Sequence, residues 1–333
     1  MLARVVPEVT SGAVERTVEA AAPGIGVASA RRSRPRVNAG VLLALAAVWI
    51  FWGSTFAAMR FVVDSVPPFV MASGRFLIAG AILYAVCIAR GRARPTRADL
   101  TGAAITGFVL LVFGNGVTAW TVQFLPTGIN SLLLSLSPIW MAIIAFAWGG
   151  ERPARSAVAG MVLGFGGLAL LLQPKAASAL PPWPVALALL SSVTWAFGSI
   201  YQRRAAKSSS LVLSTALQML FGGAFLALEA TLFGEWRSFN VHAVAAASLG
   251  GFVWLVIAGS LVAYSAYLYT MQTASTALAS TYAYVNPVVA VILGMLLFHE
   301  RFTPLEAVAS AIILIGVALM MLPARQSPEP DAL

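Results

Sequence analysis

Charged residues are scarce in this sequence, at 10% of its 333 positions, whereas an ordinary soluble domain has about 25%. Hydrophobic residues make up 59%, which excludes an ordinary water-soluble domain. The apolar residues gather in successive windows of about 20, the length that lets a helix cross a bilayer. We therefore expect an all-α integral membrane protein with ten transmembrane helices, at 40–60, 68–89, 100–122, 127–148, 155–173, 183–202, 211–233, 245–271, 275–298 and 304–322.

Cysteine and histidine are also scarce. A single cysteine, Cys87, excludes an intramolecular disulfide. The histidines are His242 and His299, and His299–Glu300 lacks the second histidine of an HExxH zinc motif. No metal and no cofactor is expected, and a membrane-embedded enzyme is the less favoured alternative because no catalytic constellation is found. We interpret His299–Glu300–Arg301 as loop residues that cap a helix.

The basic residues lie mainly between the apolar windows. Of the 21 Lys and Arg, sixteen fall in the N-terminal segment, alternate loops and the C-terminus, four fall in the opposite loops, and Arg75 lies inside the second window. Because cytoplasmic loops carry the excess of Lys and Arg, we expect a multi-pass protein of the inner (plasma) membrane with both termini in the cytoplasm. This topology accounts for the net charge of +9, and no nucleic-acid partner is expected.

The second half of the chain repeats the first at an offset of about 149 residues. The stretch PIWMAIIAFAWGGER from Pro138 corresponds to PVVAVILGMLLFHER from Pro287. Five windows per half is an odd number, so the second copy must enter the membrane inverted, as in many secondary transporters. The predicted organisation is a disordered basic cytoplasmic tail (1–39), a first repeat (40–173), a linker (174–182), a second repeat (183–323) and a cytoplasmic tail (324–333).

Three short motifs in this order resemble the EamA domains of the drug/metabolite transporter superfamily. They are WGSTF at 52–56, Arg75–Phe76 and the two stretches from proline to Glu-Arg, and the resemblance covers about 43–173 and 184–322. It implies a permease with ten helices in the inner membrane, usually an exporter of amino acids, other metabolites or drugs. The expected partners are a small-molecule substrate and the lipid bilayer, and a homodimer is left open. A non-transporting membrane assembly factor is the second alternative, disfavoured because the predicted loops are short.

Polar residues on two repeat-related helices are candidates for a substrate pathway. Ser260, Tyr264 and Tyr267 are spaced four and three apart, which places them on one helical face. The offset of 149 matches Asn115 with Tyr264 and Thr118 with Tyr267. The alternative is that these groups form packing hydrogen bonds between helices.

The prolines of the repeated stretch predict a pair of kinks. Proline removes a backbone hydrogen bond within a helix, and Ser137 and Asn286 precede Pro138 and Pro287 where they could satisfy the freed group. We expect both kinks to line a cavity and to permit gating. The alternative is an ordinary packed kink.

Deep tryptophans accompany small residues in the first and sixth windows. Trp49 and Trp52 lie beside Ser54, and Trp195 lies beside Ser199. Small residues let helices approach closely. Packing and cavity lining are therefore both open for these five residues.

Arg75 is the one ionisable residue clearly inside a predicted span. Such residues are expensive in a membrane and are functional candidates. Arg75 is expected to attract an anionic group or to bridge helices, with snorkelling to the interface as the alternative. No carboxylate reaches a midplane, since Glu229 lies near a span end, so the sequence favours a facilitator or a coupling that does not depend on a central acid.

Overall fold

The computed structural model describes residues 39–91, 94–148, 153–172, 180–204, 210–274 and 276–320. All of them belong to one compact unit, Val37–Leu333. The predicted tails at 1–38 and 324–333, most of the linker and the pair Glu151–Arg152 lie outside the described residues.

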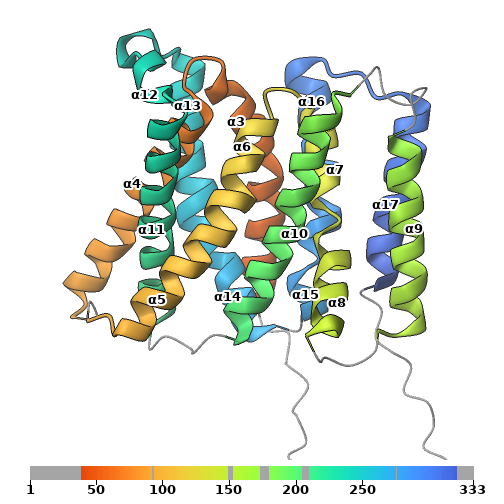
Figure 1. The fold of residues 1–333 in the computed structure, drawn as a ribbon, viewed down its shortest axis with the longest axis horizontal. Coiled ribbons are helices and arrows are strands. Elements are labelled where there is room, and N and C mark those ends of the chain that lie inside the picture. The colour runs from red at the N-terminus through yellow and green to blue at the C-terminus, as the bar shows by residue number, and fades with distance from the viewer. Residues whose placement is uncertain are drawn as a thin grey trace, which may run out of the picture. The chain divides into compact units, whose positions relative to one another are not determined.

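Every regular element of the described chain is a helix, so the all-α prediction is confirmed (Figure 1). The first half contains α2 (Ala39–Ala47), η1 (Val48–Trp52), α3 (Gly53–Val63), α4 (Pro68–Ala89), α5 (Arg97–Thr106), η2 (Gly107–Gly116), α6 (Val117–Thr121), α7 (Thr127–Leu134), α8 (Ser137–Ala147) and α9 (Arg155–Leu171). The second half contains α10 (Pro182–Arg204), α11 (Leu211–Leu232), α12 (Glu235–Ser238), η3 (Val241–Ala243), α13 (Ala246–Trp254), η4 (Leu255–Tyr264), α14 (Ser265–Thr273), α15 (Thr276–Ala279), α16 (Tyr282–Phe298) and α17 (Pro304–Met320).

Within the described residues, seven helical stretches are long and apolar enough to cross a membrane, and α9, α16 and α17 are shorter apolar helices. Large apolar side chains lie exposed along these helices, as Leu43 (72%) and Ile292 (50%) illustrate, which suits a surface that meets lipid. The seven long stretches are Ala39–Val63, Pro68–Ala89, Arg97–Thr121, Thr127–Ala147, Pro182–Arg203, Leu211–Leu232 and Ala246–Thr273.

Three of the long stretches contain π-helical backbone, which is rare and is often found at functional sites. The π-helical segments are η1, η2 and η4. Both η2 and η4 have 10 residues, and their first residues, Gly107 and Leu255, are 148 positions apart. The two segments therefore occupy nearly matching places in the two sequence halves.

Helices from the two sequence halves pack against each other. In the described chain α4 packs along α11, α9 along α17, and α16 against both α3 and α7. Glycines allow one of these contacts, because a Cβ on Gly316 would lie 2.7 Å from the carbonyl oxygen of Gly160. Close backbone approach of this kind is typical of helix pairs in membranes.

The two prolines of the repeated stretch lie in different settings. The predicted span 127–148 is interrupted at Ser135–Leu136, and Pro138 lies in the first turn of α8, a position where proline is well tolerated. The span is therefore interrupted just before Pro138, and Pro138 itself lies at the start of α8 and not in the interior of a helix. Pro287 does lie inside its helix, α16.

Candidate functional site

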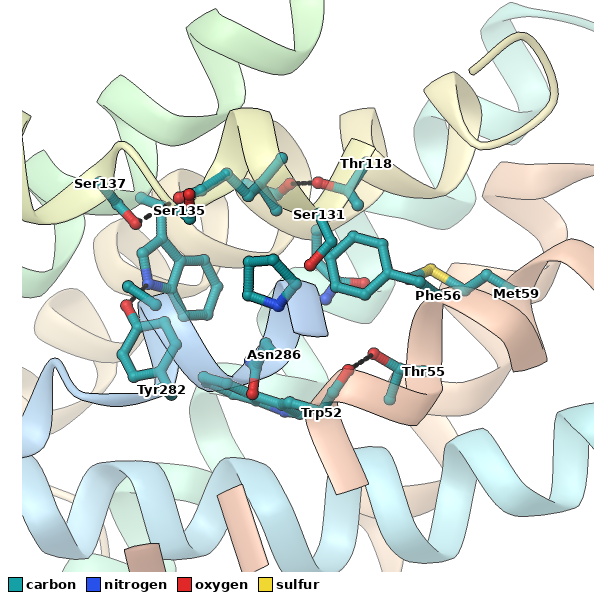
Figure 2. A pocket seen from close by; sticks show the side chains of 16 residues that line it. Trp52, Thr55, Phe56, Met59, Thr118, Ser131, Ser135, Ser137, Tyr282 and Asn286 are labelled. Carbon is teal, nitrogen blue, oxygen red and sulfur yellow. Dashed lines mark hydrogen bonds between the residues drawn. The ribbon is translucent and has the colours of Figure 1, made fainter. Parts of the chain in front are cut away.

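A cavity of about 60 Å³ lies between helices of both sequence halves (Figure 2). This volume holds several water molecules or a small solute, since one water needs about 10–15 Å³ measured in this way. Seven of the residues predicted from the sequence line it: Trp52, Asn115, Thr118, Ser137, Trp195, Asn286 and Pro287.

The other lining residues were missed by the sequence reasoning. Thr55, Phe56 and Met59 follow Trp52 at helical spacing, so their shared face was a usable signal. The remainder carried no motif and became neighbours only through packing. They are Gly114, Ser131, Leu134, Ser135, Tyr282 and Ala283.

Aromatic rings form one wall of the cavity. The ring centroid of Trp52 lies 5.4 Å from that of Trp195 and 5.5 Å from that of Tyr282, both nearly edge to face. The indole Nε1 of Trp195 donates to the hydroxyl of Tyr282 at 3.0 Å. Aromatic pairs of this geometry add stability beyond their buried area, so the wall is held in a defined shape.

Tyr264 and Tyr267 lie behind this wall and do not line the cavity. The ring of Tyr267 is 4.9 Å from Trp52, and its hydroxyl lies 2.6 Å from that of Ser199. Tyr264 donates to Gln218 Oε1 at 2.9 Å. The two tyrosines are fully buried, and their hydroxyls bond to different helices, α11 and α10. Unlike Asn115 and Thr118, neither belongs to the cavity lining.

Trp49 and Ser54 also lie outside the cavity lining. Trp49 Nε1 donates to the hydroxyl of Thr281 at 3.0 Å. The hydroxyl of Ser54 accepts from Trp254 Nε1 at 2.9 Å. Both contacts join helices of different sequence halves, which corresponds to the packing alternative.

The hydroxyl groups of the lining residues donate mostly to backbone carbonyls. Thr118 donates to Gly114 O at 2.7 Å. Ser137 donates to Leu134 O at 2.6 Å, the carbonyl that Pro138 leaves without its usual partner. These hydroxyl oxygens keep lone pairs that can accept a hydrogen bond from a bound molecule.

Two buried oxygen atoms of the lining residues have no hydrogen-bond partner among the described residues. They are Ser131 Oγ and Asn286 Oδ1. Ser131 is 2% exposed and Asn286 is 7% exposed. A buried polar atom without a hydrogen-bond partner destabilises the folded protein. A solute with a hydrogen-bond donor would therefore gain a favourable contact at either atom.

Arg75 lies next to the cavity but does not line it. Its side chain is 1% exposed, so it does not snorkel to an interface. Its Nε donates to Ser260 Oγ at 3.1 Å and its Nη1 to Asn115 Oδ1 at 3.4 Å. Arg75 therefore bridges α4 to η4 and η2, and through Asn115 it reaches the cavity.

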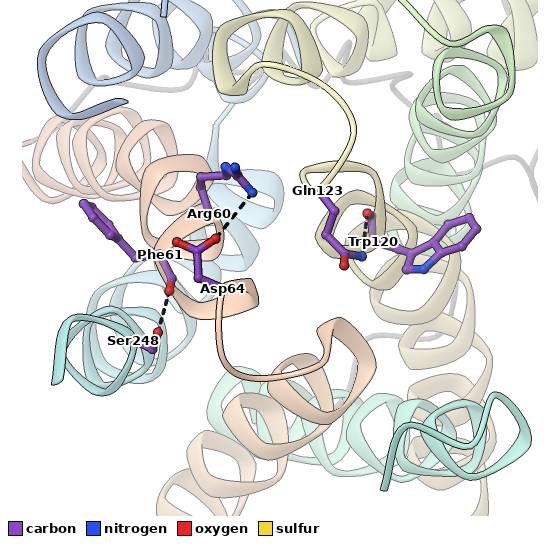
Figure 3. Close-up of polar contacts among 6 residues, drawn as sticks. All are labelled: Arg60, Phe61, Asp64, Trp120, Gln123 and Ser248. Carbon is purple, nitrogen blue, oxygen red and sulfur yellow. Dashed lines mark hydrogen bonds and ion pairs between the residues drawn. The ribbon is translucent and has the colours of Figure 1, made fainter. Parts of the chain in front are cut away.

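The polar groups near the α12 end of α3 and α6 are paired locally (Figure 3). Arg60, the residue after Met59, lies 3.5 Å from Asp64 in an ion pair. The hydroxyl of Ser248 donates to Phe61 O at 2.6 Å. Within the described part of the chain, no group of three His, Cys, Asp or Glu could hold a metal ion.

Two segments of this chain match the same protein family. The family model described as the EamA-like transporter family covers residues 38–173 and 182–322. The "Uncharacterized inner membrane transporter YedA" of Escherichia coli (strain K12) is 36% identical over 283 residues, which is 84% of this chain and 90% of that protein.

Two further similarities extend the comparison. The "WAT1-related protein At3g02690, chloroplastic" of Arabidopsis thaliana is 27% identical over 83% of this chain and 68% of that protein. A protein of known crystal structure aligns with a TM-score of 0.63 at 22% identity, covering 86% of this chain and 97% of the other. That structural likeness supports the fold alone.

Proposed function

This chain belongs to the EamA-like transporter family, and on that premise we propose that it exports small metabolites, amino acids or drug-like molecules by alternating access between two inverted repeats. It is a multi-pass membrane transporter, and the inner membrane is the proposed location because the YedA relative is named for that membrane.

The observation that carries this proposal is the position of the cavity between the two sequence halves. Trp52, Asn115 and Ser137 line it from the first half, and Trp195 and Asn286 line it from the second. Secondary transporters built from repeats hold their substrate at the repeat interface. Rocking of one half against the other would expose such a cavity to each side in turn.

The proposed architecture has ten transmembrane helices, five in each repeat. It requires α9, α16 and α17 to cross the membrane as well, although each has 17 residues, about 25 Å of helix. Flanking residues and local thinning can complete a span of that length. The two family matches and the matching places of η2 and η4 support a repeat, and the charge bias supports cytoplasmic termini.

We assign the seven predicted lining residues to the substrate pathway. Tyr264, Tyr267, Ser199 and Ser260 are assigned to a supporting layer, since they contact the lining residues or Arg75. Pro287 is the proposed gating position. A homodimer is compatible with these roles and is not required, because the cavity is formed within one chain.

The single cysteine makes a direct test of alternating access practical. Cys87 is 2% exposed, and its replacement by Ser gives a cysteine-free background. New cysteines at Thr55 and Ser137, in the cavity, are expected to react with membrane-impermeant thiol reagents from both sides, with substrate slowing the reaction. A cysteine at Val253, which is 47% exposed and does not line the cavity, is the control for labelling that does not depend on the cavity. Cavity cysteines that react from neither side would refute alternating access.

Transport itself is tested by efflux from cells that express the protein. The cells are loaded with a panel of amino acids, organic acids and cationic dyes. The comparison is the variant with Asn286→Ala and Ser131→Ala, which is expected to transport less. Increased efflux of at least one compound is expected. If the folded protein moves no compound of a broad panel while a purified enzyme activity appears, the proposal fails.

A further inference from the structure

We infer that the cavity selects solutes that carry a carboxylate or another anionic group, which binds at the amide of Asn115 with the positive charge of Arg75 behind it. This inference rests on the proposed transport function and narrows its substrate class. It also assigns the two residues different tasks, because only Asn115 lines the cavity.

The charge of Arg75 is not balanced by a carboxylate within the described part of the chain. Its hydrogen-bond partners there are Ser260 and Asn115, both neutral, and the ring of Phe76 lies 4.5 Å from its guanidinium carbon. Arg60 provides the contrast, since it is partly exposed and paired with Asp64. A buried charge without a partner is strongly unfavourable, so an anion that reaches this charge gains attraction that a neutral solute does not.

Part of the hydrogen-bonding capacity of the guanidinium is unused. Gly259 lets the guanidinium pack closely against η4, because a Cβ there would lie 3.1 Å from Arg75 Nη2. No hydrogen bond joins Nη2 to a described residue, whereas Nε and Nη1 are used. A guanidinium has five N–H donors, and part of this capacity therefore remains available.

Asn115 connects the Arg75 guanidinium to the cavity surface through a hydrogen bond. Its Oδ1 accepts from Arg75, so its Nδ2, the donor end of the amide, is free to face a solute acceptor. The hydrogen bond also polarises the amide, which strengthens it as a donor. No lining residue is Asp, Glu, Lys, Arg or His, and the hydrogen bond to Asn115 brings the positive charge of Arg75 next to the wall.

A second polar contact is available elsewhere in the same lining. Asn286 Oδ1 and Ser131 Oγ are buried without partners, and an amide oxygen accepts hydrogen bonds. The aromatic wall at Trp52 suits an apolar portion of the solute. The combined chemistry fits a small organic acid that also carries a hydrogen-bond donor, and it does not fit a lipophilic cation, which would meet no carboxylate.

The test compares matched solutes that differ in charge. Purified protein in liposomes is supplied with N-acetyl-L-phenylalanine and its uncharged amide, with L-phenylalanine and its amide, and with a cationic dye. The wild-type protein is expected to transport each acid about tenfold or more faster than its amide, the range that a hydrogen bond to a charged group supports. Arg75→Gln should reduce this acid-to-amide ratio about tenfold, and Arg75→Lys should retain more of it.

Further variants separate anion selection from structure. Arg60→Gln is the matched control and should leave the ratio unchanged. Asn115→Asp would give Arg75 an ion-pair partner and place a carboxylate at the cavity wall, so it should fold well and favour the amides over the acids. This variant keeps the inference falsifiable if Arg75→Gln does not fold.

Each outcome has a defined meaning. An equal loss of acid and amide transport in Arg75→Gln, or an unchanged ratio in Asn115→Asp, would show that Arg75 only holds helices together and would overturn the inference. Transport of amides or cations in preference to acids by the wild type would overturn the inference and leave the transporter proposal standing. Transport of none of these solutes or of the broader panel by the folded protein would overturn both.

Discussion

Glu300 caps the helix that begins at Thr127, in the other half of the chain. Its Oε1 accepts the backbone N–H of Thr127 at 2.8 Å, and its Oε2 accepts the Thr127 hydroxyl at 2.9 Å. The first N–H groups of α7 lack intrahelical partners, and a carboxylate satisfies them and complements the helix dipole. His299 adopts a left-handed conformation (φ 54°) that ends α16 just before Glu300.

Removal of this cap is expected to destabilise the fold. Glu300→Ala should lower the free energy of unfolding by about 1–2 kcal/mol, the usual cost of losing a capping group, measured by denaturation in detergent micelles. Arg301→Ala, at the exposed neighbouring residue, is the control and should change little. Equal stability of both variants would contradict the capping role.

Gly294 makes room for the same contact. A Cβ there would overlap Glu300 Oε2 and lie 2.5 Å from Thr127 Oγ1, so Gly294→Ala should weaken the cap. The effect should shrink in the Glu300→Ala background, with a coupling of about 0.5–3 kcal/mol in a double-mutant cycle. Gly166→Ala, where a Cβ meets nothing within 4 Å, is the matched control. Additive effects would show that Gly294 acts independently of the cap.

Pro287→Ala tests the gating proposal. The variant restores an N–H that can bond the carbonyl of Ala283, and both positions line the cavity. We expect stability to be kept or increased while the transport rate falls, because the added hydrogen bond stiffens α16. Pro138→Ala, in the first turn of α8, should affect transport less. Unchanged transport by Pro287→Ala at normal expression would remove the gating role.

Glu235 predicts a pH dependence of stability. Its Oε2 accepts the N–H groups of Phe69 and Val70 at the start of α4, at 2.9 and 3.0 Å. Partial burial raises the pKa of this carboxyl above its usual value of 4.5, and the two hydrogen bonds oppose that shift. The folded state therefore binds the proton more tightly than the unfolded state. The stability gained from this tighter proton binding by Glu235 is fully present below about pH 4.5. It is lost as the pH rises through the pKa of Glu235 in the folded state.

Two variants check this sign. Glu235→Gln keeps an acceptor oxygen for the two N–H groups and should remove the decline, so its melting temperature between about pH 4 and about pH 8 should vary less than that of the wild type. Glu235→Ala should be less stable than Glu235→Gln at every pH, because the cap is lost. A steeper decline in Glu235→Gln would show that the pKa is shifted downward.

The site was only partly predictable because the direction of a side chain depends on how its helix is rotated. Ser260 and Tyr264 lie in η4, where π-helical bonding changes the angular spacing assumed for an α-helix. Their hydrogen bonds are to Arg75 and Gln218, neither of which lines the cavity. Trp52 and Asn115, which the sequence offered as candidates, do line the cavity. They lie in η1 and η2, and the packing that places them in one cavity cannot be read from the local sequence pattern.

The membrane class, the helical content and the family could all be read from the sequence, because apolar windows, charge bias and short motifs are properties of neighbouring positions. Which polar groups contact one another depends instead on the packing of the helices. This packing places Glu300 on Thr127, Arg75 behind Asn115, and Ser131 and Asn286 in one cavity without partners. These residues are far apart in the chain, and only the packing of helices against one another, within a half for Arg75 and Asn115 and between halves for Glu300 and Thr127, brings them together.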